Sequence, residues 1–300
     1  MNSPLSYHEG ELAVHARAGV GREGLAADEM YHATMGVGVV RFLAAQHIAA
    51  LSTMDRDGRV WASLRSGAPG FLHASDALTL EIGGSSHPSD PLLANLALGA
   101  AAGVLVINLE ARQRVRLNGD ARLTEAGVVR LTVKQVYGNC PQYIQARGVV
   151  GERPVSDGSA ACGDSLNTRW RRWVETADTF FLATAHPSSG LDASHRGGKP
   201  GFVRVETENR VIFPDYPGNR MFNSLGNITS YPKAGLLFAD FESGAGLQLS
   251  GTANILWENA RVAEFPGAQR LVALEIERVI ELPQVTRLEF EFRSYSPHLR

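Results

Sequence analysis

SLRSGAPGF at residues 63–71 returns as SHRGGKPGF at residues 194–202, which is 131 positions further along the chain. Neighbouring segments return at nearly the same shift, namely 50–53 at 181–184, 95–96 at 227–228, 102–106 at 234–238 and 117–119 at 249–251. A nearly constant shift over about seventy residues is hard to produce by chance, so the chain contains two similar units. Two copies can pack as the subunits of a symmetric dimer do, and the seam between them is then a natural place for a ligand.

The composition is that of an ordinary soluble globular protein. Of 300 residues, 44% are hydrophobic and 20% are charged, and 29 Lys and Arg residues nearly balance 31 Asp and Glu residues. Since there is no basic excess and no apolar run of membrane-spanning length, we expect neither a nucleic-acid partner nor a membrane partner. We also expect no secretory signal. Two cysteines, Cys140 and Cys162, are too few for a disulfide framework or a metal site, so we expect a cytoplasmic protein without a bound metal.

Short β-rich runs separated by turns dominate both units, and Asp57-Gly58 is a strong hairpin signal. The runs lie at 49–54, 60–65, 77–82, 104–109 and 113–123, and again at 180–185, 201–206, 211–213, 235–241 and 246–255. Each unit also contains one short helical segment, at 91–98 and at 221–228. Many short strands with few helices, twice over, predict a mainly β protein of two small barrels with flanking helices.

The remaining segments indicate how the two barrels are joined. We expect an N-terminal helical extension at 1–45, a first barrel with connecting helices at 46–147, a linker at 148–165 and a second barrel at 166–300. Residues 128–136 and 141–147 have the composition of helices, whereas 148–163 is rich in Gly, Ser, Pro and Asp. A helix at 166–176 leads into the second barrel, and strands at 271–282 and 284–292 close it.

Four segments carry a resemblance to a known family. They are 194–202, PGNR at 217–220 with NSLGNI at 223–228, KAGLLF at 233–238 with the run 247–253, and YGNCPQYIQ at 137–145. Together with YHEGE at 7–11, they resemble the flavin-binding split-barrel family of pyridoxamine 5'-phosphate oxidase, and in particular its tandem-repeat subfamily. The resemblance implies two tandem Greek-key split barrels that form a pseudo-dimer within one chain and bind flavin mononucleotide (FMN) at the seam.

The phosphate of FMN requires Arg or Lys together with short polar donors at a loop or helix start. The second unit offers such a set, and glycine there lets the backbone approach the cofactor closely. The expected cofactor-binding residues are Ser194, His195, Arg196, Gly197, Asn219, Arg220, Asn223 and Ser224. No catalytic acid or base can be assigned, and for His195 a structural role is the favoured interpretation, with contact to the flavin ring or a substrate as the alternative.

The first unit has lost most of these groups. At the repeat shift, Asn219, Arg220, Asn223 and Ser224 correspond to His87, Pro88, Pro91 and Leu92, and only Arg196 keeps its counterpart, Arg65. We therefore expect one flavin site per chain, with the phosphate held by the second unit. The first unit would contribute seam residues such as Arg112, Gln113 and Arg114, and a remnant site built on Ser85, Ser86 and Ser89 stays open.

Several other polar residues have two interpretations. Tyr137, Gln142 and Tyr143 either cover the site or pack in the core, and Cys140 before Pro141 is expected to be a small buried residue. His8, Glu9, Glu11 and His15 have no closed metal-ligand spacing, so we expect a flexible N-terminal segment there.

The resemblance implies an FMN-dependent oxidoreductase that acts on a small molecule. Arg287 and Arg293 lack the context of the arginine-rich substrate-phosphate motif of true pyridoxamine phosphate oxidases, so oxidation of vitamin B6 is not predicted. Two alternatives remain: a flavin-binding or flavin-sensing protein without turnover, and a haem-binding or haem-degrading split barrel. Association of two chains into a homodimer also stays open.

Overall fold

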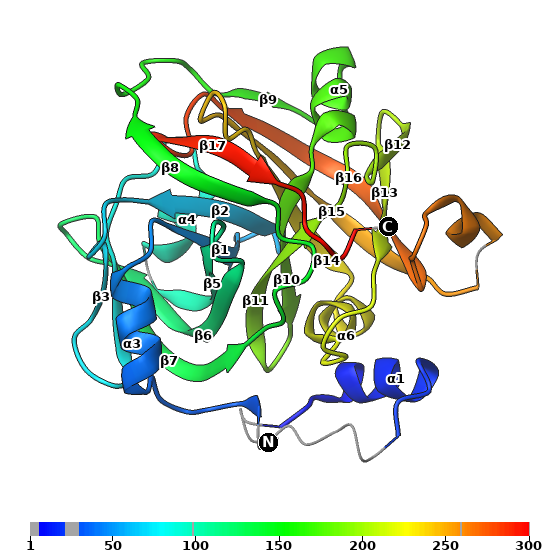
Figure 1. The fold of residues 1–300 in the computed structure, drawn as a ribbon, viewed down its shortest axis with the longest axis horizontal. Coiled ribbons are helices and arrows are strands. Elements are labelled where there is room, and N and C mark those ends of the chain that lie inside the picture. Colours follow the sequence, from blue (N-terminus) through cyan, green and yellow to red (C-terminus); the bar gives the residue numbers. More distant parts are fainter. Residues whose placement is uncertain (1–5, 22–29, 98, 259, 300) are drawn as a thin grey trace.

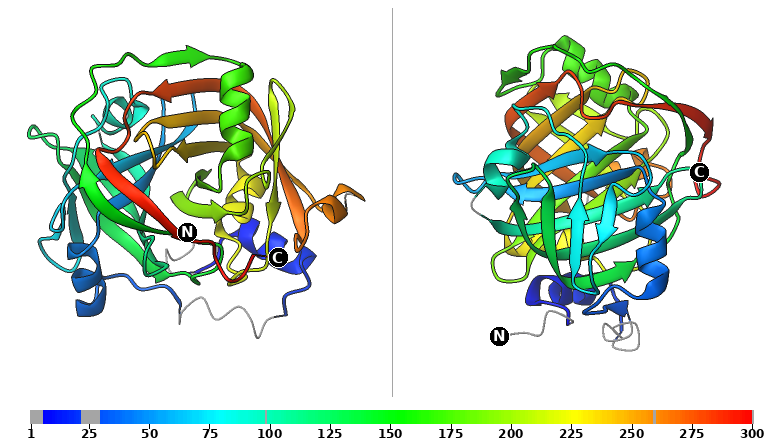
Figure 2. Two further views of the ribbon diagram at one scale, coloured as in Figure 1. Left: turned by 45° about the horizontal axis from the view of Figure 1, so that its top comes forward. Right: turned by 90° about the vertical axis from the view of Figure 1, so that its left-hand side faces the viewer.

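The computed structural model describes residues 6–21, 30–97, 99–258 and 260–299. Two large antiparallel sheets, one in each half of the chain, curl around separate hydrophobic cores (Figures 1 and 2). The first sheet contains β1 (Ile48–Met54), β2 (Val60–Ser66), β3 (Leu72–Ala74), β4 (Thr79–Ile82), β5 (Ala100–Asn108), β6 (Gln113–Leu123) and β7 (Val129–Gly138). The second contains β10 (Thr179–His186), β11 (Gly190–Gly197), β12 (Arg204–Thr207), β13 (Arg210–Asp215), β14 (Lys233–Ala239), β15 (Gly246–Leu256) and β16 (Arg270–Leu282), with β9 (Ala161–Gly163) added to β16.

The strand order repeats in full. It is β2-β1-β5-β6-β7-β4-β3 in the first sheet and β11-β10-β14-β15-β16-β13-β12 in the second, so each strand has a counterpart at the same place. Even an irregularity is copied, because the register of the β6–β7 pair shifts at Asn118/Gly119 and that of the β15–β16 pair at Ser250/Gly251. The mainly β architecture of two similar split barrels, predicted from the sequence repeat, is confirmed.

The two barrels pack through a pseudo-symmetric seam. A Cβ atom on Gly103 of β5 would lie 2.6 Å from the Cα atom of Asp192 on β11. A Cβ atom on Gly235 of β14, the counterpart of Gly103, would lie 2.9 Å from the Cα atom of Trp61 on β2. Only glycine permits such close backbone approach. In one contact the glycine comes from the first barrel and its neighbour from the second, and in the other contact these roles are reversed. Such reciprocal contacts are the pattern of an isologous dimer interface.

In the described residues five helices flank the sheets, and the first of them lies against the second barrel. They are α1 (Glu9–Arg17), α3 (Val37–Ala44), α4 (Pro91–Leu96), α5 (Thr168–Thr176) and α6 (Asn223–Ser230), and a 3-10 turn, η2, spans Ala260–Glu264. α1 crosses α6 (Figure 1), where Gly226 leaves room for the backbone of Glu11, 2.7 Å from where a Cβ would be. None of the helices in the described part of the chain is long and apolar enough to cross a membrane.

The connection between the barrels differs from the expectation. Residues 128–136 form β7, not a helix, because Val129, Leu131 and Val133 are buried while the residues between them face outward, which is the period of a strand. Residues 141–147 form turns followed by β8 (Ala146–Glu152), and much of the expected linker is therefore strand.

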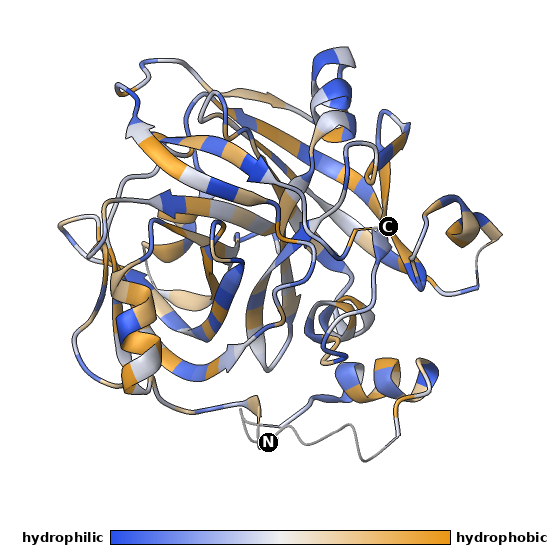
Figure 3. Cartoon of the chain, in the orientation of Figure 1, coloured by the Kyte–Doolittle hydropathy of each residue, from blue (hydrophilic) through white to orange (hydrophobic). Residues whose placement is uncertain are grey.

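β8 pairs with β17 (Leu288–Ser294), the last strand of the chain. Hydrophobic and hydrophilic residues alternate along β17 (Figure 3). Because its partner is about 140 residues away, the composition of the linker could not reveal this pairing. The expected helices at 91–98, 166–176 and 221–228 are confirmed as α4, α5 and α6.

Candidate functional site

A partly open cavity of about 100 Å³ lies at the seam, and its walls come from both barrels. β6 contributes Arg114 and Arg116, and the segment 139–143 covers it. Seven of the eight expected residues line the cavity, namely His195, Arg196, Gly197, Asn219, Arg220, Asn223 and Ser224. The eighth, Ser194, lies one layer behind, with its Oγ atom 3.1 Å from the Oγ atom of Ser224.

Arginine dominates the charge around this cavity. Arg116 pairs with Asp192 at 2.7 Å, and Asp215 accepts from both Arg196 at 2.8 Å and Arg270 at 2.9 Å. Arg114 and Arg220 also line the cavity, so five guanidinium groups face two carboxylates. The surplus positive charge favours an anion.

Several donors of the cavity wall have no partner among the described residues. They include the buried Nε atoms of Arg114, Arg116 and Arg196. The Nδ1 atom of His195 lies 3.4 Å from the guanidinium of Arg114 and must accept, which places the ring proton on Nε2, and Nε2 also lacks a partner. One buried acceptor, Oδ1 of Asn139, also has no hydrogen-bond partner among the described residues. Buried donors are normally satisfied, so the donor set points to a ligand that accepts hydrogen bonds.

Burial and the neighbouring charges shift the pKa values of the groups that line the cavity. Burial, together with the neighbouring Arg116, lowers the pKa of Arg114 to about 10, which still leaves this group charged at neutral pH. Burial and the nearby Arg114 hold the pKa of His195 well below its ordinary value. Burial alone would lower the pKa of Arg116, but the carboxylate of Asp192 raises it. His195 is therefore neutral while the arginines are charged.

The loop before α6 brings polar groups to the cavity in an unusual backbone conformation. Arg220 and Phe222 both have positive φ angles, 60° and 56°, which is uncommon for residues other than glycine. α6 begins at Asn223 rather than at the expected 221, so Asn223 and Ser224 form its first turn. Asn223, Ser224 and Leu225 line the cavity, so the N-terminal end of the helix, with its free N–H groups and partial positive charge, lies beside it.

Asn223 has a different task from the one expected. Its Nδ2 atom donates to Oε1 of Glu11 at 2.5 Å and to the hydroxyl of Tyr31 at 2.6 Å. Both amide hydrogens are thus used, and the side chain has only an acceptor to offer a ligand. The side chain of Asn223 therefore positions the loop and does not donate to an anion.

The N-terminal helix holds this loop in place. His15 lies 2.8 Å from the carbonyl of Arg220, and His8 lies 3.0 Å from Oδ1 of Asn227 on α6. His8, Glu11 and His15 are all buried, and burial raises the pKa of Glu11 to about 7. The expectation of a flexible segment at these residues is wrong, because α1 buries its polar side against α6.

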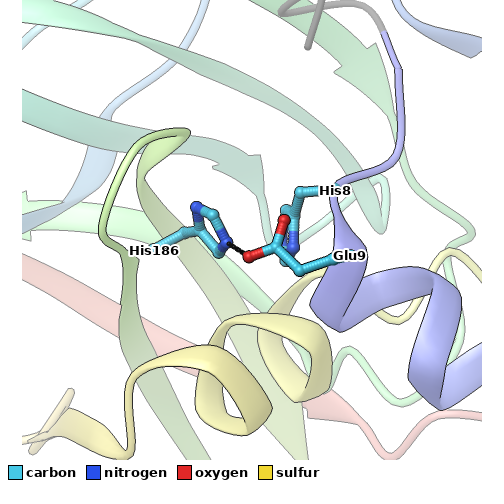
Figure 4. Close-up of side chains that lie close together, drawn as sticks. All are labelled: His8, Glu9 and His186. Carbon is cyan, nitrogen blue, oxygen red and sulfur yellow. Dashed lines mark hydrogen bonds and ion pairs between the residues drawn. The ribbon is translucent and has the colours of Figure 1, made fainter. Parts of the chain in front are cut away.

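His8, Glu9 and His186 offer potential metal-ligand atoms within 4.8 Å of one another (Figure 4). The Nδ1 atom of each histidine accepts from backbone amides, from Gly10 at 3.2 Å and from Ser189 at 3.0 Å. Each ring proton therefore lies on Nε2, and His186 donates it to Glu9 at 2.8 Å. A histidine that binds a metal through Nε2 carries its proton on Nδ1 and donates it to a carbonyl or carboxylate. Here the Nδ1 atoms accept instead, so we describe this cluster as a hydrogen-bonded contact between α1 and the β10–β11 hairpin.

The sequence analysis overlooked Arg116, Asp192 and Asp215. The alternation of Arg114 and Arg116 along one strand was an available signal, since alternate residues share a face. No local pattern identifies Asp192 or Asp215, because their partners are distant in the sequence.

Of the expected seam residues, only Arg114 lines the cavity; Arg112 instead donates to the carbonyl of Ile144 and to the C-terminal segment. Gln142 and Tyr143 belong to the cover, whereas Tyr137 is buried behind it and donates to Asp192 at 2.6 Å. Cys140 also lies in the cover and donates to Gln142 at 3.4 Å.

Comparisons with known proteins give one family match, in the second half of the chain, and a number of similar solved structures. Residues 166–296 match the sequence model of the family described as pyridoxamine 5'-phosphate oxidase. No curated protein matches the chain. HupZ of Group A Streptococcus is 17% identical, with 39% of this chain and 98% of that chain covered and a TM-score of 0.32. A candidate pyridoxamine 5'-phosphate oxidase of Lactobacillus delbrueckii is 20% identical, with 39% of this chain and 94% of that chain covered and a TM-score of 0.32. General stress protein 26 of Bacillus anthracis is 12% identical, with 40% of this chain and 92% of that chain covered and a TM-score of 0.30.

Proposed function

Residues 166–296 belong to the pyridoxamine 5'-phosphate oxidase family of split barrels, and on this premise we propose that the protein binds one FMN per chain and acts as an FMN-dependent oxidoreductase on a small molecule. The observation that carries the proposal is the arginine-lined cavity at the seam, whose buried Nε–H groups have no partner among the described residues. A phosphate with close to two negative charges satisfies such donors.

The cavity fits the phosphate end of the cofactor. Its volume of about 100 Å³ is below the several hundred Å³ of pockets that enclose a whole small molecule. Binding of the complete nucleotide therefore requires the covering segment 139–143 to move. Within that segment the hydroxyl of Tyr143 donates to the carbonyl of Pro217 at 2.9 Å, its backbone N–H donates to Oγ of Ser296 at 3.1 Å, and its ring lies 5.0 Å from that of Tyr216.

The residues of the chain divide the work as follows. Arg114, Arg116 and Arg196 would hold the anionic end, and neutral His195 would add one more donor through Nε2. The buried Asp192 keeps Arg116 charged and oriented. FMN, when bound, supplies the electron-transfer chemistry, and the protein supplies binding, orientation and the local field.

Purification followed by titration tests this proposal. We expect the protein to bind FMN with one site per chain, measured by the change in flavin absorbance and fluorescence. We expect a reduced nicotinamide or dithionite to bleach the bound flavin and air to restore it. A protein that stays colourless and ignores added FMN would contradict the cofactor assignment.

The same preparation separates the two alternatives. A protein that binds FMN but oxidises or reduces no small molecule in a turnover screen would be a flavin-binding or flavin-sensing protein. A Soret band after addition of haemin, in the absence of flavin binding, would identify a haem protein.

A further inference from the structure

A second and larger cavity, of about 740 Å³, lies on the other side of the same seam. Its walls are β6 and β7 of the first barrel and the β10–β11 hairpin of the second, and α1 and α6 border it. A volume in this range encloses a whole small molecule. The groups beside it include two with displaced pKa values, Glu11, raised to about 7, and His8, lowered to about 4, both chiefly because of burial.

One layer of side chains separates the two cavities. Asn223 lines both of them, Arg116 lines the smaller one, and Asp192 lines the larger one. The buried Arg116–Asp192 pair thus forms part of the dividing wall, and Tyr137, which also lines the larger cavity, donates to the same carboxylate. A ligand in the larger cavity would lie close to a cofactor anchored in the smaller one.

The chemistry of the larger cavity is the opposite of that of the smaller one. Among the described residues that line it there is no arginine, and its lysine, Lys134, is already paired with Asp120 at 2.6 Å. Met54, Ala101 and Leu191 give it apolar surface. Such a site offers a phosphate no free guanidinium.

One polar atom in this wall lacks a partner. Asn118 is 8% exposed, and its Nδ2 atom donates to Gln135 and to Tyr137. Its Oδ1 atom, which must therefore accept, has no partner among the described residues. A buried acceptor without a donor is a reason to expect a ligand that carries an N–H or O–H group.

We propose that the larger cavity is the substrate site, and that it takes an uncharged or cationic molecule with an apolar body and a hydrogen-bond donor, not a phosphate ester. This proposal rests on the assignment of FMN to the smaller cavity. It narrows the substrate class, because a phosphorylated substrate would need the cationic groups that the smaller cavity alone provides.

Three probes that share one ring system test the charge preference. Benzylamine, benzyl alcohol and benzyl phosphate are titrated into the FMN-loaded protein, and binding is followed by ligand-observed NMR. We expect benzylamine and benzyl alcohol to bind at least tenfold more tightly than benzyl phosphate. Equal or tighter binding of benzyl phosphate would overturn the proposal, as would loss of benzylamine binding to the apoprotein when FMN is added, since FMN would then occupy this cavity itself.

A pair of matched variants locates the binding. Ala101→Leu fills the larger cavity and should weaken benzylamine binding about tenfold or more, whereas Ala111→Leu adds the same atoms at an exposed turn and should change nothing. FMN affinity, measured separately by fluorescence, should be the same in both. If the Ala101→Leu variant binds benzylamine as tightly as the unmodified protein does, the substrate site lies elsewhere. If FMN never binds, the cofactor assignment fails. The titration of the three probes into the apoprotein still decides whether the larger cavity binds a ligand of the proposed class.

Discussion

The two barrels meet at two places related by the pseudo-symmetry, and only one of them has kept the chemistry of a binding site. At the first place Arg116 pairs across β6 and β7 with Tyr137, and at the second Gln248 pairs across β15 and β16 with Ile280. Asp192 of the first place is replaced by Trp61 at the second. The first place therefore contains a buried ion pair, whereas glutamine and tryptophan stand at the corresponding positions of the second.

The fate of the shared arginine shows the difference most directly. Arg65 is 2% exposed and donates to the backbone carbonyls of Ile82 and Gly127 at 2.9 Å each. Its counterpart Arg196 donates to Asp215 and retains a buried Nε atom that has no partner in the described part of the chain. The same residue type thus serves the fold in one copy and faces a cavity in the other.

Gln248 completes the contrast. Its Nε2 atom lies within hydrogen-bond distance of the carbonyl of Ala62, the hydroxyl of Ser63 and a carboxylate oxygen of Asp90. The second place has therefore no surplus of positive charge. A duplicated fold has two equivalent places where a binding site can form. Substitutions at one of these places can replace the binding groups with side chains that pack the seam.

Arg116→Gln, which copies position 248 of the other seam, should have the largest effect. It leaves Asp192 buried without its cation, and we expect the free energy of unfolding to fall by about 3–5 kcal/mol, measured by chemical denaturation. Adding Asp192→Asn should recover stability but not FMN binding. A single variant as stable as the unmodified protein would show that the pair is not essential to the seam.

Arg196→Ala and Arg65→Ala should separate binding from stability. We expect Arg196→Ala to weaken FMN binding by about tenfold to a hundredfold, since a charged hydrogen bond contributes about 1.5–3 kcal/mol. Arg65→Ala should lower the free energy of unfolding and leave FMN affinity unchanged, because its donors are bonded to backbone carbonyls. The reverse pattern in fluorescence titration and denaturation would assign the phosphate to the first barrel.

Arg220→Ala should weaken FMN binding less, by about tenfold, because this side chain is exposed to solvent and its electrostatic contribution is screened. Pro88→Ala, at the corresponding position of the first unit, serves as the control and should not change the affinity. Equal losses from both substitutions would refute the difference between the two copies.

Glu11→Gln should have the smallest effect, on the pH dependence of stability. The pKa of Glu11 is raised by burial from 4.5 to about 7, so the folded state binds its proton more tightly than the unfolded state does. The contribution is fully present below about pH 4.5 and is lost as the pH rises to about 7. We expect the variant to show a flatter profile in this window, measured by denaturation at several pH values.

If the free energy of unfolding of Glu11→Gln varies with pH as that of the unmodified protein does, ionisation of Glu11 does not destabilise the folded state. Asp90, at the other seam, is the natural comparison, because burial raises its pKa as well. Asp90→Asn should act in the same direction without a change in FMN affinity.

Much of the fold and part of the site could be predicted from local patterns. The alternating strands, the helices at 91–98 and 221–228, and seven of the residues that line the smaller cavity follow from runs of neighbouring residues and from the repeat. Two expectations were wrong: residues 128–136 form a strand and not a helix, and the polar residues of α1, expected to be flexible, are packed against α6. β7 pairs with the neighbouring strand β6, whereas α1 packs against α6, about 210 residues away in the chain.

By itself, the sequence determined the duplication, the mainly β architecture and the loss of polar residues from the first unit, because these are properties of residue order and spacing. Only the tertiary structure decided that Arg116 lines the same cavity as Arg196, that Asn223 donates to Glu11 and Tyr31, and that a second cavity lies behind Asp192. Charge pairing and burial depend on distances between strands of different barrels, and no local pattern encodes those distances.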